Sequence, residues 1–262
     1  MQENLHTHTT RCRHASGTEE EYVQQAIAGG LQVLGFSDHT PHRFPGTYYS
    51  TMRMFPEELE DYYTTVMALK EKYAGQIHIH LGLEVEYYPK LIPALLELIK
   101  PFPIEYMILG QHWCGNEENE IHNGRATDDE LSLARYCDQT IEALQTGLFT
   151  YFAHPDLFNF IGDDAIYRRH IGRLCQTAKD TNIPLEINFL GLRDGRNYPR
   201  DLFWEIAGEI GCPVVFGSDA HTVQHVFDLD TEARAREMVK KYNLTLLEHI
   251  PIRPWYTAKI AK

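Results

Sequence analysis

Three histidines lie close together near the amino terminus of the chain, in the stretch Leu5–His14. In an extended strand, side chains two positions apart point the same way, so His6 and His8 can converge on one ion. His14 lies beyond the expected end of the strand, where a loop can fold it back. Neutral imidazole is the commonest side-chain ligand for zinc-like ions, but one pair does not complete a site. Distant segments must therefore supply further ligands.

Other residues with ligand chemistry follow apolar, strand-like runs. Asp219 and His221 repeat the spacing of the first pair, and further runs end at one histidine or carboxylate each: His39, Glu84, His112 and His154. A lone histidine after a strand is more often structural than a ligand, but so many strand ends of this kind in one chain are hard to obtain by chance. Histidines in expected loops or helices, such as His122, are assigned no ligand role.

These strand ends belong to an alternation of short apolar runs and helical patterns. After a first strand that ends at His8, strands are expected at 31–36, 77–81, 106–110, 149–153, 184–188 and 213–217. Helices are expected at 18–29, 56–74, 90–100, 127–146, 164–181, 200–210 and 223–241. The alternation predicts a single α/β domain over residues 1–262, with a parallel sheet that is closed or nearly closed into a barrel. The carboxyl ends of barrel strands surround one mouth, so residues far apart in sequence meet there.

Composition narrows the possible partners and the compartment. The chain has 24 Lys and Arg against 37 Asp and Glu, a formal charge of -13, which argues against nucleic acid or an anionic membrane as a partner. The five cysteines are odd in number and form no CxxC pair, which favours reduced thiols in a cytoplasmic protein. There is no signal-peptide pattern and no apolar run of about 18 residues, so neither secretion by that route nor a membrane span is expected.

Six short motifs occur in order along the chain: His6-Thr7-His8, Ser37-Asp38-His39, Gly82-Leu83-Glu84, Gly110-Gln111-His112, Ala153-His154-Pro155 and Ser218-Asp219-Ala220-His221. Over essentially the whole length, this ordered set resembles the PHP (polymerase and histidinol phosphatase) family, and most closely its stand-alone histidinol-phosphatase branch. The resemblance implies a distorted (β/α)7 barrel with a metal site at the C-terminal ends of the strands.

The resemblance also implies a site of three divalent metal ions, with zinc, manganese and iron all compatible with its mixed ligands. His6, His8 and Asp219 would hold one ion, and His112 with His154 a second. Glu84 would bridge these two ions. The third ion would be held by three histidines: His14, His39 and His221.

The reaction that follows from this resemblance is hydrolysis of a small phosphomonoester, favouring L-histidinol phosphate, by a hydroxide shared between two ions. The residues expected to act in catalysis are Glu84, Asp219, His221 and Arg193. A guanidinium can bind phosphate through two parallel hydrogen bonds. The first choice for phosphate binding is Arg193, in the loop expected after the sixth strand, and the further candidates are Arg53, Arg125 and Arg196. Carboxylates that can meet the substrate's ammonium or imidazole are Glu86, Asp156 and Glu186.

Two alternatives remain open. The loop from Asn188 to Arg193 is more apolar than expected of a histidinol phosphatase, so a PHP-type phosphoesterase or phosphodiesterase with another small phosphorylated substrate fits the metal ligands equally well. An amidohydrolase-like C–N hydrolase also uses an HxH strand and a barrel mouth. The chain has no lysine at an expected strand end to form a carboxylated bridge, although Glu84 could bridge instead.

Overall fold

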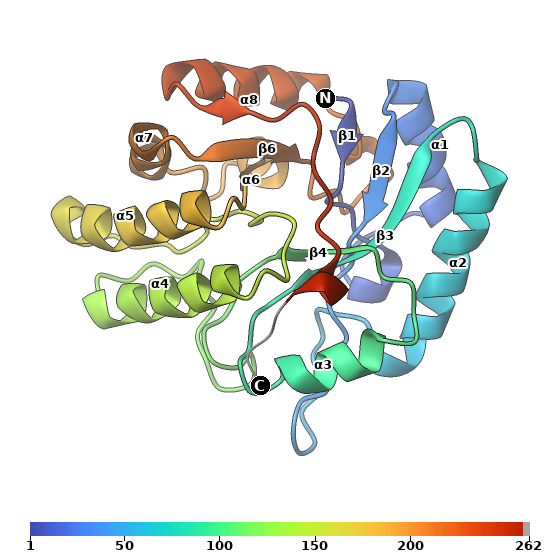
Figure 1. Cartoon of the computed structure of the whole chain (residues 1–262), viewed down its shortest axis with the longest axis horizontal. Coiled ribbons are helices and arrows are strands. Elements are labelled where there is room, and N and C mark those ends of the chain that lie inside the picture. The colour runs from blue at the N-terminus through green and yellow to red at the C-terminus, as the bar shows by residue number, and fades with distance from the viewer. Residues whose placement is uncertain (259–262) are drawn as a thin grey trace.

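Parallel strands run through the middle of the molecule, with helices outside them (Figure 1). This computed structural model describes residues 1–258, so residues 259–262 of the predicted domain lie outside the described part. One sheet has the order β1 (Glu3–Asn4), β2 (Val33–Phe36), β3 (His78–Val85) and β4 (Tyr106–Leu109). The other has the order β5 (Leu185–Asn188), β6 (Pro213–Gly217) and β7 (Thr245–Leu246). Every strand pair is parallel, which is typical of strands joined by helical crossovers.

Single-residue bridges connect the two sheets. Phe152 pairs in parallel with Leu109 of β4 and with Leu185 of β5, and Thr7 pairs with Ala220 beyond the ends of β1 and β6. The sheets therefore form one curled parallel surface, and the carboxyl ends of its strands lie together.

Most of the helices carry local signals that explain where they begin. The helices are α1 (Glu19–Gly29), α2 (Leu59–Lys72), α3 (Ile92–Ile99), α4 (Glu130–Gln145), α5 (Asp164–Asp180), α6 (Phe189–Asp194), α7 (Asp201–Ile210) and α8 (Leu229–Lys241). Short 3-10 turns occur at η1 (Thr10–Cys12), η2 (Pro56–Glu58), η3 (Val223–His225) and η4 (Trp255–Thr257). Thr18 forms a capping box with Glu21, and aspartates cap α4, α5 and α8. Within residues 1–258, no helix is both long and apolar enough to cross a lipid bilayer.

Most predicted strands and helices are confirmed to within a few residues, and several segments differ. The first strand, expected to end at His8, ends at Asn4, and Thr7 beyond it forms only a single bridge. The expected strand 149–153 is a bridge at Phe152 only, although Thr150 and Ala153 also donate backbone hydrogen bonds to the neighbouring β4 segment. The loop expected after β5 is helix α6, because the side chain of Asn188 accepts from the backbone N–H of Gly191 and caps it. The last predicted helix is divided into η3 and α8, because Asp228 starts a new helix. Strand β7 was not predicted.

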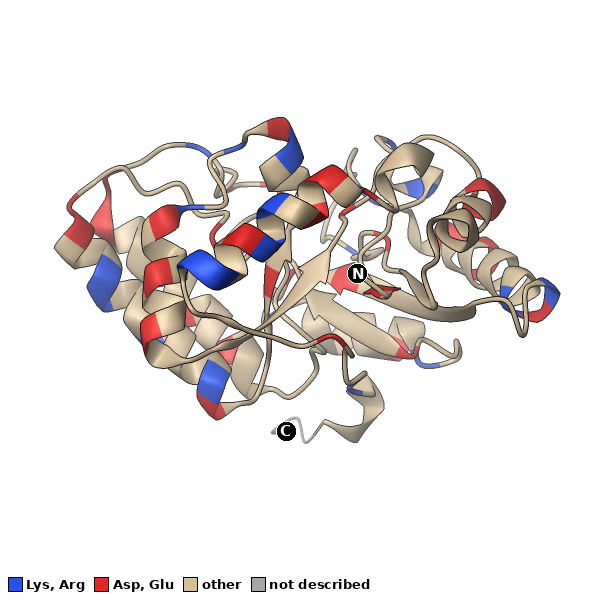
Figure 2. Ribbon diagram, turned by 90° about the horizontal axis from the view of Figure 1, so that it is seen from above, with Lys and Arg blue, Asp and Glu red and all other residues tan. Residues whose placement is uncertain are grey.

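Charge is distributed according to this architecture. Figure 2 shows the acidic and basic positions mainly on the outer helices, whereas the central strands are largely uncharged. The strands are buried on both faces, which explains why they read as continuous apolar runs. The carboxylates and histidines at their carboxyl ends are therefore exceptions that need a specific explanation.

Tyr106 of β4 supports the first strand just before His6. A Cβ added at Gly82 would lie 2.3 Å from the Tyr106 ring, and one added at Gly35 would lie 2.2 Å from its hydroxyl oxygen. Its hydroxyl, fully buried, donates a hydrogen bond of 2.8 Å to the carbonyl oxygen of Leu5. The two glycines therefore make room for a side chain that fixes the backbone leading into the histidine pair.

We expect Tyr106→Phe to lower the free energy of unfolding by about 1 to 3 kcal/mol, because the buried carbonyl of Leu5 loses its donor. Urea denaturation followed by circular dichroism measures this change. Tyr49→Phe is the matched control, since the Tyr49 side chain is 74% exposed and should leave stability unchanged. Equal stability of the two variants would contradict the supporting role of Tyr106.

Candidate metal centre

All nine predicted metal ligands lie together at the carboxyl ends of the strands. They come from segments more than two hundred residues apart, as the barrel-like arrangement predicts. Most lie at or just after the ends of β1, β2, β3, β4 and β6, another follows the Phe152 bridge, and one follows η1; in chain order they are His6, His8, His14, His39, Glu84, His112, His154, Asp219 and His221.

Four buried atoms face one another in the first group. Asp219 Oδ1 lies 3.1 Å from His8 Nε2 and 3.6 Å from His6 Nε2. Glu84 Oε2 lies 3.5 Å and 3.6 Å from the same two nitrogens. None of these four atoms makes a hydrogen bond within the described residues. Buried polar atoms without partners are costly, so the donor set fits a cation that all four atoms can share.

Glu84 connects this first group with a second one. Its other oxygen, Oε1, lies 2.8 Å from His154 Nε2 and 3.7 Å from His112 Nε2. The two oxygens of one carboxylate thus point toward different imidazole groups. This is the position that a bridging ligand requires.

The third group contains His14, His39 and His221, whose nitrogens lie within 4.8 Å of one another. His14 Nδ1 lies 2.7 Å from the carbonyl oxygen of Cys12, and His221 Nδ1 lies 3.1 Å from that of Asp219. A carbonyl only accepts, so in each neutral ring the proton is on Nδ1. The Nε2 atoms of His14 and His221 then face each other at 3.0 Å as two acceptors. A cation between them removes this repulsion.

Carboxylates behind the imidazoles fix their orientation. His6 Nδ1 lies 2.7 Å from Glu186 Oε1, His112 Nδ1 lies 2.9 Å from Glu86 Oε1, and His8 Nδ1 lies 3.4 Å from Asp38 Oδ1. An acceptor on Nδ1 holds the proton there and leaves Nε2 free to bind a metal, as in many metalloproteins.

These contacts correct part of the sequence analysis. Glu86 and Glu186 are fully buried and bonded to imidazoles, so they are not free to meet a substrate's ammonium. Asp156 is also buried and accepts from the backbone of Arg200 and the indole of Trp204.

The electrostatics of the cluster favour positive charge at the first group. Burial by itself would lower the pKa of His6, but the carboxylates of Glu186, Asp219 and Glu84 together raise it well above its usual range. Burial would likewise raise the pKa of Glu84, yet the surrounding imidazoles hold it well below its usual range. In the third group, burial lowers the pKa of His39 to about 4. Carboxylates therefore stay ionised, and cations are attracted to the nitrogens nearest to them.

Close backbone approach makes this geometry possible. A Cβ added at Gly110 would lie 1.9 Å from Glu84 Oε1, and one added at Gly217 would lie 1.7 Å from Glu186 Oε1. Only glycine leaves room for these carboxylates to reach the imidazoles. Gly110 and Gly217 thus have a steric role in the site.

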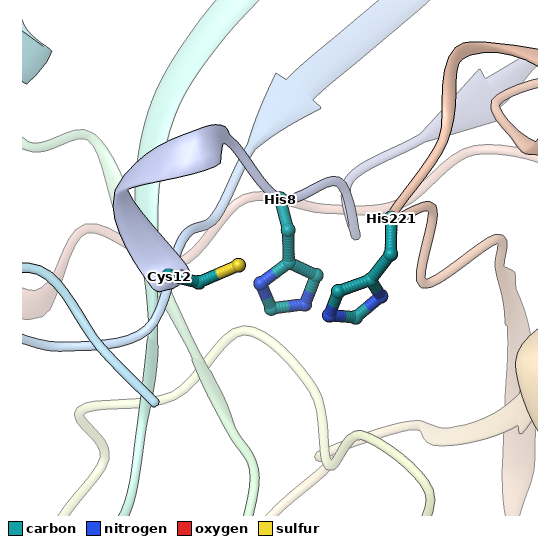
Figure 3. Close-up of side chains that lie close together, drawn as sticks. All are labelled: His8, Cys12 and His221. Atoms are coloured by element: carbon teal, nitrogen blue, oxygen red, sulfur yellow. The ribbon is translucent and has the colours of Figure 1, made fainter. Parts of the chain in front are cut away.

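Cys12 is a neighbour of the cluster that the sequence analysis treated only as a reduced thiol. Figure 3 shows its sulfur beside the ring of His8, with the ring of His221 on the other side. The rings of His8 and His221 are stacked with centroids 4.1 Å apart. Burial, with the charge of Asp38, raises the pKa of the Cys12 thiol well above its usual range. A neutral thiol in this position packs behind His8.

A cavity of about 560 Å³ opens over the cluster. Its lining includes six of the predicted ligands: His14, His39, Glu84, His112, Asp219 and His221. Around them lie Met52 from the segment before α2 and His122 from the segment after β4. The cavity is large enough for a small phosphorylated metabolite.

The four arginines predicted to bind phosphate occupy different places. Arg125 is exposed and does not line the cavity. Arg196 lines the cavity and lies 3.3 Å from the hydroxyl of Tyr198. Arg193 is on α6, outside the cavity lining, with an enclosed guanidinium 3.6 Å from Asp228. Arg53 is buried and paired with two glutamates, which argues against direct contact with phosphate and corrects that expectation.

Sequence reasoning missed several polar residues of the cavity, among them His122 and Asp194. His122 was assigned no role, but its Nδ1 accepts from the backbone N–H of Gly124, so the neutral ring carries its proton on Nε2. Burial and the nearby imidazoles of His112 and His154 lower the pKa of His122 to about 4. Asp194 is the only carboxylate among the cavity-lining residues of the described chain that is not a predicted ligand. Its position next to Arg193, in a segment already singled out, was the available signal.

Comparison with known proteins gives concordant results. The PHP domain family matches residues 4–189. A protein of Deinococcus radiodurans named "Probable histidinol-phosphatase" is 31% identical over 225 residues, covering 82% of this chain and 85% of the relative. The histidinol-phosphatase of Bacillus subtilis is 25% identical over 249 residues, covering 82% of this chain and 92% of the relative.

Solved structures support the same fold. Histidinol phosphate phosphatase from Lactococcus lactis, in a crystal structure with zinc, L-histidinol and phosphate, aligns with a TM-score of 0.73 at 19% identity. The alignment covers 99% of both chains. The α/β arrangement of a curled parallel sheet with outer helices is therefore shared with that enzyme.

We expect Gly110→Ala to reduce the metal content of the purified protein, because the new Cβ displaces the Glu84 carboxylate from between its imidazoles. Plasma mass spectrometry of the dialysed protein measures metal per chain. Gly172→Ala, on α5, is the control, since a Cβ there meets nothing within 4 Å. Full metal content in Gly110→Ala would show that Glu84 does not need its observed position.

Proposed function

The chain belongs to the PHP family, and we propose on this basis that it is a metal-dependent phosphatase that hydrolyses L-histidinol phosphate to L-histidinol and phosphate. The family match, the relatives named histidinol-phosphatase and the cluster of nine ligand side chains support this function together. The observation that carries the proposal is the set of buried, unpartnered atoms on His6, His8, Glu84 and Asp219, which face one another across 3.1 to 3.6 Å.

The proposed site takes three divalent ions, with zinc, manganese or iron as candidates. His6, His8 and Asp219 hold one ion, His112 and His154 a second, and Glu84 lies between them. The remaining three histidines hold the third: His14, His39 and His221. When bound, the ions supply a Lewis acid for the phosphoryl oxygens and lower the pKa of water.

Charge balance in this site suits a phosphate monoester. Glu84 and Asp219 are the two anionic ligands, so three divalent ions keep net positive charge. A dianionic phosphoryl group supplies part of the missing negative charge. His6 and His112 each carry a proton on Nδ1 and donate a hydrogen bond from it, to Glu186 and Glu86. Both imidazoles therefore remain neutral ligands.

The cavity walls provide complementary groups for the rest of the substrate. Arg196 carries a guanidinium for the phosphoryl oxygens, and the Nε2–H of His122 can donate to an oxygen of the same group. Asp194 offers a carboxylate for the ammonium of histidinol. Arg193 lies outside this lining, on α6, with its Nε 3.7 Å from Asp194 Oδ1.

For the architecture, we propose a single phosphoesterase domain built as a distorted (β/α)7 barrel. The bridges at Phe152 and between Thr7 and Ala220 support closure, because they join the two sheets at two separate places.

All five cysteines are free thiols, which supports the predicted cytoplasmic compartment.

The test of this function is phosphate release from L-histidinol phosphate, compared with a panel of phosphomonoesters and phosphodiesters, by protein of measured metal content. We expect selective turnover of L-histidinol phosphate, which is lost on chelation and restored by added metal. Selective turnover of another ester would support the phosphatase function but reject L-histidinol phosphate as the substrate. A metal-loaded protein that hydrolyses no ester would reject the phosphatase function.

We expect Arg196→Met to raise KM for L-histidinol phosphate about tenfold, because a hydrogen bond to a charged group contributes roughly 1.5 to 3 kcal/mol. The value of kcat should change less, since Arg196 lies outside the ligand cluster. Steady-state kinetics measures both values. Arg125→Met is the control, because Arg125 is exposed and does not line the cavity. Similar KM values for the two variants would remove Arg196 from the phosphate site.

A further inference from the structure

A buried ionic cluster lies next to the metal centre but outside the cavity. It consists of Arg53, Glu86 and Glu117, whose residues are 2%, 0% and 8% exposed. Ionised side chains are rarely buried to this extent unless they are paired, because removing them from water is costly. A cluster of this kind adds little net stability, so its position needs another explanation.

The guanidinium of Arg53 holds the two carboxylates together. Nη1 donates to Glu86 Oε2 at 2.7 Å and Nη2 to Glu86 Oε1 at 3.0 Å, a two-point pair. Nε donates to Glu117 Oε2 at 3.0 Å, and Nη2 also contacts this oxygen. A lysine has a single ammonium and cannot reproduce this planar arrangement.

Glu86 connects Arg53 with the predicted metal ligand His112. Its Oε1 accepts from Arg53 Nη2 and also lies 2.9 Å from His112 Nδ1. His112 therefore has Glu86 behind its ring and Glu84 in front of it, because the two glutamates are two positions apart at the end of β3. The direction of the His112 ring depends on where Arg53 holds Glu86.

The same cluster joins two segments that border the cavity. Arg53 belongs to the segment between β2 and α2 and also donates to the carbonyl of Thr40 at 3.2 Å. Glu117 belongs to the segment between β4 and α4 and accepts from the hydroxyl of Tyr48 at 2.8 Å. These segments also contribute Met52 and His122 to the cavity lining.

We propose that Arg53, Glu86 and Glu117 are positioning residues that hold the His112 ring as a ligand and make metal retention depend on the docking of these two segments. The inference rests on the metal site proposed above. It concerns one ion only, the one that His112 and His154 share. The other two ligand groups have no contact with Arg53 among its described hydrogen bonds.

The first test measures metal affinity by competition with a chelating dye, independently of turnover. We expect Arg53→Met to weaken one bound ion per chain by about 10- to 100-fold, the usual effect of losing a group that orients a ligand. Arg53→Lys should weaken it less, since it restores the charge but not the two-point pair. The control is Glu120→Gln, which alters an exposed pair with Arg135 in the same segment as Glu117.

A double-mutant cycle shows whether Arg53 acts through His112. We expect His112→Ala and the double variant with Arg53→Met to bind this ion equally weakly, because the imidazole that Arg53 positions is already gone. In cobalt-substituted protein, Arg53→Met should change the visible absorption bands of one ion. Additive losses, or equal weakening of all bound ions, would overturn the proposal and indicate a general effect on folding.

Milder variants keep the test valid if Arg53→Met does not fold. Glu117→Gln and Tyr48→Phe leave Arg53 and Glu86 in place and weaken only the outer end of the cluster. We expect both to release the same ion faster than the wild type does, with Glu117→Gln the stronger. Release rates equal to those of Glu120→Gln would overturn the proposal, even in a protein that hydrolyses L-histidinol phosphate. A wild-type chain that binds no metal would overturn both this inference and the proposed function.

Discussion

The structure depends on the fixed direction of the imidazoles at its metal centre. Carboxylates or backbone carbonyls lie against Nδ1 of His6, His112, His14 and His221, so each neutral ring presents Nε2 as an acceptor toward the centre. The centre also contains the buried, ionised carboxylates of Glu84 and Asp219. Acceptors that face one another without donors are unfavourable, and divalent cations are the groups that satisfy all of them. A core with only a structural role would not bury so many polar groups.

The strands meet this constraint because their ends coincide in space. Parallel pairing brings the ends of β1, β3 and β6 to one edge, and the bridge between Thr7 and Ala220 joins the first and last of these segments. Gly110 and Gly217 then allow two carboxylates to approach the backbone closely. Errors of about 1 Å in this arrangement would separate ligands that need to share an ion. The rigid core behind the site is therefore a requirement of its chemistry.

The sequence was sufficient to predict that the nine candidate ligands lie together, but not to identify the residues that position or surround them. His6 and His8 could be grouped because side chains two positions apart in an extended segment share a face, and Asp219 because it follows a predicted strand. Arg53 could not be placed, because its partner Glu117 lies in an irregular segment whose path depends on tertiary packing. Arg196 and His122 are in similar segments. The helix after β5 was missed for a local reason, since Asn188 caps it in a stretch that was interpreted as a loop.

Arg53 and Arg196 have different proposed roles: Arg53 positions a metal ligand, and Arg196 binds phosphate. The chain carries a formal charge of -13, which repels a dianionic substrate at long range. Among the described residues that line the cavity, Arg196 is the only lysine or arginine, so one guanidinium must act against this field. Most of the attraction for phosphate must then come from the bound ions. Substrate affinity and catalysis therefore both depend on the bound ions and are not separable properties of the site. An arginine that holds a metal ligand in place, as proposed for Arg53, thus influences phosphate binding without contacting the phosphate.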